Sequence, residues 1–129
     1  MKIEHIAIWC EDLEKMKSFY QTFFNAESNN KYENPKKGFS SYFLSLSKGA
    51  RIELMKMDSV EILPKNVQKQ FTGMAHVAFS LGSVEKVDQL TESLASNGIE
   101  IISGPRWTGD RYYESEILDP EGNRVEITA

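Results

Sequence analysis

Two histidines and two glutamates occupy equivalent places in a pattern that the chain carries twice. Residues 5–8 (HIAI) reappear as residues 76–79 (HVAF), and residues 49–54 (GARIEL) reappear as residues 122–127 (GNRVEI). Each repeat therefore begins with a histidine and ends with a glutamate, and these are His5, Glu53, His76 and Glu126. Imidazole and carboxylate ligands together suit Zn, Ni, Co, Mn or Fe(II), and they disfavour Cu(I). We therefore predict a metal site on the axis that relates the two repeats.

Either residue type taken alone would say little about function. A single strand histidine is more often structural or solvated than a ligand, and a glutamate near a turn is usually solvated. The joint occurrence at matching places in both repeats favours a metal site, although duplication alone could have copied a structural His–Glu pair. Cys10 is the only cysteine, and we interpret it as a small residue at a strand end rather than as a nucleophile.

The elements that must position these residues follow the same order in both halves, which is one strand, one helix and three strands. Asp12 is a plausible N-cap, and apolar residues then follow helical spacing. In the first half we predict strands at 2–9, 39–46 and 51–57, a helix at 13–24, and a polar strand or ragged edge at 25–34. In the second half we predict strands at 73–81, 99–103, 112–118 and 123–128, a helix at 83–96, and a loop at 104–111.

Strand alternation decides where the repeated residues point, because side chains two positions apart share a face. In each strand the uniformly apolar face can pack against a helix, which leaves the histidine or glutamate on a mixed face. This mixed face also carries large apolar side chains, which are Trp9, Phe43, Met55, Met57 and Met74. Such a face is too apolar for open solvent, so we predict that it lines a cavity.

Composition restricts the class of protein. The chain has 129 residues, of which 40% are hydrophobic and 26% are charged, as in ordinary globular proteins. A net charge of −4 argues against nucleic-acid and anionic-membrane partners. No apolar run approaches the roughly 18 residues needed to span a bilayer, and the N-terminus lacks the layout of a signal peptide. With a single cysteine, the natural compartment is a reducing cytoplasm.

The layout of the two repeats resembles the vicinal oxygen chelate superfamily, which includes glyoxalase I, extradiol dioxygenases and bleomycin-resistance proteins. The resemblance covers essentially the whole chain and includes residues 119–123 (DPEGN) before the final glutamate. It implies an α+β fold of two tandem βαβββ modules that form a curved half-barrel sheet system with helices on the convex face. The superfamily's metal-ligand positions fall on His5, Glu53, His76 and Glu126, with one divalent metal per site.

The resemblance also implies how the chain is organised. Residues 1–129 form a single domain, with module one at 1–58, a linker at 59–72 and module two at 73–129. Relatives usually form homodimers, and some build each metal site from one module of each chain. Whether His5 and Glu53 join His76 and Glu126 of the same chain or of a partner therefore stays open.

Among relatives, the ligand set is most similar to that of glyoxalase I, which has His, Glu, His and Glu in this order. The extra glutamate disfavours an extradiol dioxygenase, and bleomycin-type binding proteins have usually lost the ligands. Glyoxalase I typically contacts glutathione with an arginine and an asparagine, where this chain has Trp9 and Met57. An indole and a thioether cannot hold carboxylates in that way, so we expect a smaller or more apolar substrate than glutathione.

The resemblance implies a lyase or isomerase that acts by metal-stabilised proton transfer on a small molecule with vicinal oxygens. Glu126 would be the proton-transfer base, with Glu53 as its symmetric partner, and either Glu114 or Glu116 could be a second acid–base group. The alternatives are a non-catalytic small-molecule or antibiotic-binding protein and an Fe(II) dioxygenase. The loop 104–111 is a candidate lid, in which Arg106 or Arg111 could bind an anionic substrate. The candidate substrate-binding residues are Trp9, Phe43, Met55, Met57, Arg111 and Tyr112.

Overall fold

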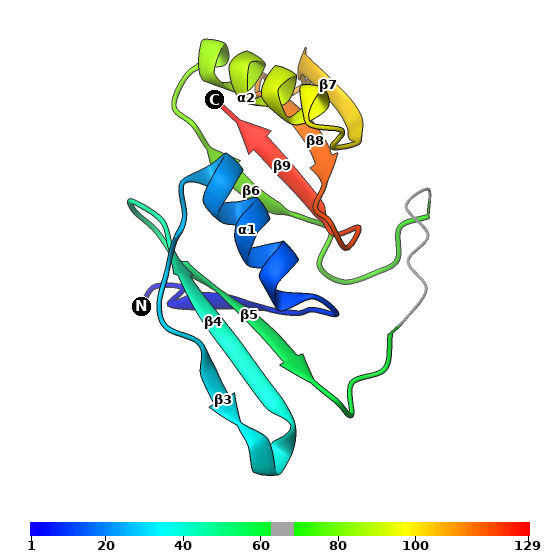
Figure 1. Ribbon diagram of the computed structural model, residues 1–129. Coiled ribbons are helices and arrows are strands. Elements are labelled where there is room, and N and C mark those ends of the chain that lie inside the picture. Colours follow the sequence, from blue (N-terminus) through cyan, green and yellow to red (C-terminus); the bar gives the residue numbers. More distant parts are fainter. Residues whose placement is uncertain (63–68) are drawn as a thin grey trace. The chain divides into compact units, whose positions relative to one another are not determined.

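The computed structural model describes residues 1–62 and 69–129 (Figure 1). The chain divides into two compact units, Met1–Pro64 (unit 1) and Lys65–Ala129 (unit 2). The middle of the expected linker, residues 63–68, lies outside the described residues. None of the described helices is both long and apolar enough to cross a membrane.

Unit 1 contains one helix and one mixed sheet. Its elements are β1 (His5–Trp9), α1 (Leu13–Phe24), β2 (Glu27–Ser28), β3 (Tyr32–Asn34), a short 3-10 helix η1 (Pro35–Lys37), β4 (Phe39–Ser45) and β5 (Arg51–Met57). The strand order is β1-β5-β4-β2, and β3 also pairs with β4. The β1–β5 pair is parallel and the other pairs are antiparallel. The segment predicted as a ragged edge is thus two short strands, β2 and β3.

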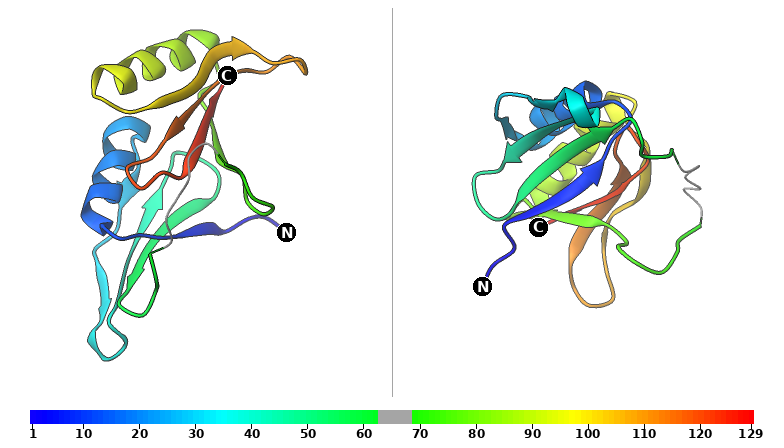
Figure 2. Two further views of the ribbon diagram at one scale, coloured as in Figure 1. Left: turned by 90° about the vertical axis from the view of Figure 1, so that its right-hand side faces the viewer. Right: turned by 90° about the horizontal axis from the view of Figure 1, so that it is seen from below.

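Among the described residues, unit 2 repeats this plan with a four-stranded sheet in place of the five-stranded sheet of unit 1. Its elements are β6 (Val77–Ser80), α2 (Val84–Ser96), β7 (Ile101–Trp107), β8 (Tyr113–Leu118) and β9 (Arg124–Thr128). The order is β6-β9-β8-β7, with β6 parallel to β9 and the other pairs antiparallel. In Figures 1 and 2, α2 lies across one face of this open sheet. The predicted α+β fold of two tandem βαβββ modules is therefore confirmed.

Both helices are fixed by side-chain caps and by an apolar stripe. The Asp12 carboxylate accepts a hydrogen bond from the Lys15 backbone N–H at 3.0 Å, and the Ser83 hydroxyl accepts one from Lys86 at 3.3 Å. The buried residues are Leu13, Met16, Phe19 and Tyr20 on α1, and Val87, Thr91 and Leu94 on α2. These stripes cover the apolar strand faces, which leaves the opposite face of each sheet for the histidines and glutamates.

The predicted loop 104–111 is wrong in its first half. Strand β7 continues through Gly104 and Pro105 to Trp107, so only the turn after Trp107 connects it to β8. The glycine and proline do not end the strand, because β7 is the edge strand of its sheet and two register shifts accommodate them. Gly104 and Pro105 lie in the second register shift, and Arg106 and Trp107 pair with β8, so residues 104–107 are part of the sheet and the proposed lid is not supported there.

The strand predicted at 73–81 is shorter in the structure, because β6 spans only Val77–Ser80. His76 thus immediately precedes β6 instead of lying inside it, and Met74 is exposed further upstream. Tyr112 likewise falls just before β8. The chain direction through these flanking residues still allows His76 to reach the face predicted for it, as the distances below show.

Candidate functional site

In unit 1 the two predicted ligands lie on neighbouring parallel strands. The register of β1 against β5 places Ala7 opposite Glu53, and His5 is two residues before Ala7 on the same face. The Nε2 atom of His5 lies 3.6 Å from the Oε2 atom of Glu53. Parallel pairing of the first and last strands of the unit therefore brings together residues that are far apart in the sequence.

Unit 2 contains the equivalent pair. Ala78 of β6 lies opposite Glu126 of β9, and His76 is two residues before Ala78. The Nε2 atom of His76 lies 3.5 Å from the Oε2 atom of Glu126. The two units thus present the same His–Glu geometry at the same register position.

The chemistry of these pairs fits a divalent metal ion. The side chains of His5 and Glu53 are 38% and 15% exposed, and those of His76 and Glu126 are 39% and 21% exposed, so an ion can reach them. Metal–nitrogen and metal–oxygen distances of about 2.0–2.2 Å put two ligands of one ion about 3 Å or slightly more apart. Each unit brings together one histidine and one glutamate at about this spacing, and no three His, Cys, Asp or Glu side chains gather as a metal-binding group within residues 1–62 and 69–129.

A second carboxylate, which the sequence did not single out, contacts the first histidine. The Glu4 carboxylate accepts a hydrogen bond from Nδ1 of His5 and hydrogen bonds from the Arg51 guanidinium. The hydrogen bond from His5 has the largest effect and those from Arg51 the next largest, and together they lower the pKa of Glu4 below its usual value. The predicted strand 2–9 would place Glu4 on the face opposite His5, but β1 begins only at His5, so this contact could be found only from the structure.

Around Glu126, unit 2 gathers further carboxylates and two arginines. Glu116 lies opposite Glu126 on β8, and Arg124 donates a hydrogen bond to Glu116 at 2.6 Å. Arg106 lies opposite Glu114, with 3.4 Å between the charged atoms. The pKa of Glu126 lies above its usual value because the carboxylate is partly buried, and because Glu114 and Glu116 repel its charge while His76 opposes the shift. A raised pKa is suited to a carboxylate that accepts and releases a proton.

The face of unit 1 that carries His5 and Glu53 is rich in aromatic rings and thioethers. The Trp9 and Phe39 ring centroids are 6.3 Å apart, and those of Tyr32 and Phe39 are 6.1 Å apart. Phe39 pairs with Met57 across the β4–β5 ladder, Phe43 pairs with Glu53, and Met55 lies between them on β5. Sequence reasoning missed Phe39 and Tyr32, although the alternation that selected Phe43 also places Phe39 on this face.

The sequence matches the model of the Glyoxalase/Bleomycin resistance protein/Dioxygenase superfamily over residues 2–127. The chain belongs to this superfamily. Two Bacillus subtilis (strain 168) proteins are similar along their whole length. YwkD is 31% identical over 97% of this chain and 94% of its own, and YqjT is 28% identical over 98% of both.

Solved structures of the superfamily share the fold. A glyoxylase/bleomycin resistance protein/dioxygenase domain from Frankia sp. EAN1pec has a TM-score of 0.82 at 18% identity, covering 99% of this chain and 96% of that domain. The V278E mutant of glyoxalase I from Zea mays has a TM-score of 0.79 at 21% identity over 98% of this chain. This chain spans only 44% of the length of the maize enzyme.

The remaining predicted site residues, Arg111 and Tyr112, lie in the turn between β7 and β8. Arg111 has a positive φ of 74°, and its backbone N–H donates to the Thr108 carbonyl at 3.1 Å. The Tyr112 backbone N–H donates to the Thr108 hydroxyl at 2.9 Å, while the Tyr112 side chain is exposed. Thr108 thus stabilises the turn. The contact of Arg111 and Tyr112 with substrate remains a prediction.

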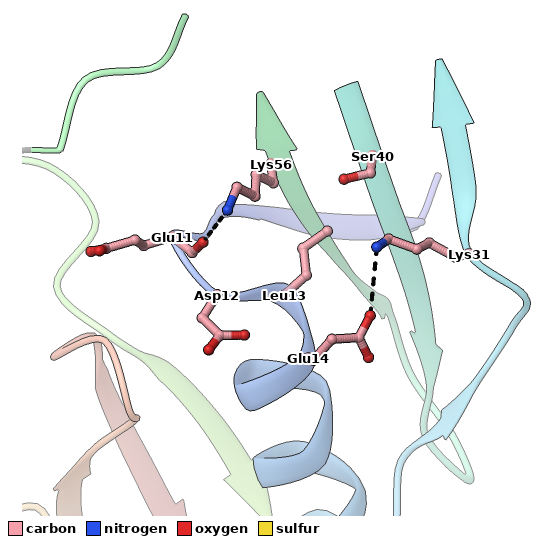
Figure 3. A pocket seen from close by; sticks show the side chains of 7 residues that line it. All are labelled: Glu11, Asp12, Leu13, Glu14, Lys31, Ser40 and Lys56. Atoms are coloured by element: carbon pink, nitrogen blue, oxygen red, sulfur yellow. Dashed lines mark hydrogen bonds and ion pairs between the residues drawn. The ribbon is translucent and has the colours of Figure 1, made fainter. Parts of the chain in front are cut away.

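A pocket of about 380 Å³ lies elsewhere in unit 1, beside the N-terminus of α1 (Figure 3). It is lined by Glu11, Asp12, Leu13, Glu14, Lys31, Ser40 and Lys56. The Lys56 ammonium donates to the Glu11 backbone carbonyl at 2.7 Å, and Lys31 lies 3.6 Å from the Glu14 carboxylate. Its two cations are therefore engaged with oxygen atoms of the pocket itself, and none of the predicted site residues lines it.

Proposed function

We propose that this superfamily member is a glyoxalase-like metalloenzyme, a lyase or isomerase that moves a proton on a small molecule with vicinal oxygens. The observation that carries the proposal is the repeated His–Glu pair, with N–O separations of 3.6 Å in unit 1 and 3.5 Å in unit 2. The metal ligands are His5, Glu53, His76 and Glu126, for one divalent ion per site. Zn, Ni, Co or Mn is proposed ahead of Fe(II), because the second glutamate departs from the two-His-one-carboxylate set of Fe(II) oxygenases.

In this proposal His5 and His76 bind the metal, and the glutamates also take part in proton transfer. When bound, the metal supplies a Lewis acid for adjacent substrate oxygens and stabilises negative charge beside a C–H bond. Glu126 accepts the proton at a carboxylate oxygen, and Glu53 holds the symmetric place. Glu114 and Glu116 form ion pairs with Arg106 and Arg124, and their negative charge favours the protonated form of Glu126.

The substrate is proposed to be smaller or more apolar than a glutathione adduct. Trp9 and Met57 stand where glyoxalase I has groups that bind glutathione, and the same face presents Phe43 and Met55. Rings and thioethers offer dispersion contacts and edge-to-face packing, which favour an apolar or planar group next to the chelating oxygens. Arg111 and Tyr112 are proposed to contact the polar end of the substrate.

A second candidate is a protein that binds a small molecule or antibiotic without turnover. The cluster of Trp9, Tyr32 and Phe39 favours it, because an aromatic wall can bind a ligand whether or not a metal is present. An Fe(II) dioxygenase is a third and weaker candidate. Metal content separates the first candidate from the second, and oxygen consumption with iron identifies the third.

The test is elemental analysis of the wild-type protein, purified without any chelator. The same measurement is made on His5→Ala, His76→Ala and the double variant. The proposed function requires stoichiometric Ni, Zn, Co or Mn that is lost in the double variant. Glu33→Ala is the matched control, because Glu33 is an exposed carboxylate whose ion-pair partner is Lys31. If the wild-type protein takes up no ion after incubation with each metal, the catalytic proposal is wrong and the binding protein remains.

Mixing the two single variants decides which chains share a site. If each site combines unit 1 of one chain with unit 2 of another, a mixed dimer of His5→Ala and His76→Ala contains one intact set of ligands. Metal content and activity then recover after the two proteins are mixed and allowed to exchange subunits. If the site lies within one chain, no intact set forms and neither recovers.

A further inference from the structure

Glu4 is held in place on both its main chain and its side chain. Its backbone carbonyl accepts a hydrogen bond from the Arg51 N–H at 3.0 Å, next to the β1–β5 ladder. One carboxylate oxygen accepts hydrogen bonds from the Arg51 guanidinium, where the Nε distance is 2.9 Å. The other oxygen contacts Nδ1 of His5. The carboxylate therefore has a fixed orientation although its side chain is about half exposed.

This contact determines which imidazole nitrogen of His5 carries the proton. A neutral imidazole has one N–H group and one lone pair, and a carboxylate accepts only from the nitrogen that bears hydrogen. With hydrogen on Nδ1, the lone pair is on Nε2, which is 3.6 Å from Glu53 Oε2. The Nε2 lone pair and the Glu53 carboxylate then lie close together, and this is the state in which a histidine binds a metal ion through Nε2.

Phe43 packs against the imidazole, and Arg51 packs on Phe43. The rings of His5 and Phe43 are 5.4 Å apart with an interplanar angle of 85°. The Arg51 guanidinium lies 4.2 Å from the centroid of the Phe43 ring. Arg51 thus packs on Phe43 while it binds Glu4, so the three residues together define the position of the His5 ring.

The second unit does not repeat this arrangement. Ala75 stands immediately before His76, where Glu4 stands before His5. Arg124 corresponds to Arg51 in the repeated segment, but its guanidinium pairs with Glu116 at 2.6 Å. Among the residues that the structure describes, a carboxylate bonded to Nδ1 of the histidine is therefore found in unit 1 alone.

We propose that Glu4 is a positioning residue that holds His5 with hydrogen on Nδ1 and the Nε2 lone pair directed at the metal position. The inference rests on the proposed function for its role in metal binding, but the proton position is a property of the metal-free protein. The two histidines then differ in the position of their hydrogen before the ion binds. His5 already carries it on Nδ1, which leaves Nε2 free to ligate, whereas His76 does not. Neutral histidine in water favours hydrogen on Nε2, and Nε2 of His76 faces the Glu126 carboxylate at 3.5 Å, so His76 is expected to retain that preference.

The test combines nitrogen-15 NMR of the histidines with measurement of metal affinity. Spectra of the metal-free protein above about pH 8, where an ordinary imidazole is neutral, report which nitrogen of each ring bears hydrogen. Competition with a chelator gives the affinity for Zn and Co. The variants are Glu4→Ala, which removes the acceptor, and Glu4→Gln, which keeps an oxygen that accepts from Nδ1. Glu33→Ala is the matched surface control.

We expect His5 to carry hydrogen on Nδ1 in the wild type and in Glu4→Gln, and to change toward Nε2 in Glu4→Ala. Metal affinity should fall about 10-fold to 100-fold in Glu4→Ala and recover most of the loss in Glu4→Gln. Hydrogen on Nε2 of His5 in the wild type, or an affinity of Glu4→Ala equal to that of Glu33→Ala, overturns the inference. Hydrogen on Nδ1 in a protein that takes up no metal supports the positioning by Glu4 and refutes the proposed function instead.

Discussion

Replacing Gly104 by alanine should destabilise the protein far more than replacing Gly98, although both glycines have a positive φ of similar size. The φ angles are 84° and 78°. A Cβ atom at Gly104 would lie 2.5 Å from the Glu114 carbonyl oxygen and 2.9 Å from Ser115 Cα, whereas a Cβ at Gly98 has nothing within 4 Å. Both substitutions share the cost of a left-handed conformation, and only one adds a collision.

The collision cannot be relieved easily because its partners are main-chain atoms of β8. Ser115 is fully buried, and its hydroxyl is 2.6 Å from the hydroxyl of Thr91 on α2. A left-handed conformation costs a residue with a side chain about 1–2 kcal/mol, and overpacking adds about 1–3 kcal/mol. We therefore expect Gly104→Ala to lose about 2–5 kcal/mol of unfolding free energy and Gly98→Ala about 1–2 kcal/mol.

The assay is equilibrium unfolding in urea, followed by far-ultraviolet circular dichroism, on the wild type and both variants. The difference between the two variants isolates the close approach of β7 to β8. Equal losses for the two substitutions would refute the reasoning, because they would show that Gly104 is required only for its backbone angle.

Three further predictions concern the core, an ion pair and the ligands. Leu54→Ala removes a fully buried side chain of β5 and should lower the unfolding free energy in urea by about 2–5 kcal/mol. A variant as stable as the wild type would contradict this, because it would show that neighbouring residues fill the cavity. The pKa of Glu14 is lowered by hydrogen bonds from Lys17 and then Tyr42. The ionised carboxylate therefore stabilises the folded protein at a pH above the pKa of Glu14 in the unfolded chain, and this stabilisation is lost as the pH falls through its pKa in the folded protein. The advantage of the wild type over Glu14→Gln in unfolding midpoint should therefore shrink on acidification from neutral pH, and a constant advantage would contradict this linkage. Glu53→Gln and Glu126→Gln each replace an anionic ligand by a neutral amide and should weaken Zn binding in chelator competition more than Glu4→Ala does; unchanged affinity in either variant would remove that residue from the ligand set.

Prediction from the sequence succeeded where a signal is local and periodic. The apolar stripe behind Asp12 predicted α1 with its observed bounds, because a capped amphipathic helix depends on nearby residues. The same holds for β5, whose alternation gave its bounds and its buried face. The predicted end of β7 was wrong because glycine and proline are tolerated on an edge strand, and only the strand order shows which strand is at the edge.

By itself, the sequence determined that two equivalent βαβββ units each carry one histidine and one glutamate on the face opposite a helix. Repetition and alternation are properties of residue order, so they can be read before any contact is known. Only the tertiary structure decided that Glu4 contacts His5 and Arg51, because Glu4 lies outside β1 and is 47 positions from Arg51 in the sequence. Parallel pairing of β1 and β5 brings these groups together, and side-chain orientation at the end of a strand depends on the neighbouring strand instead of on local sequence.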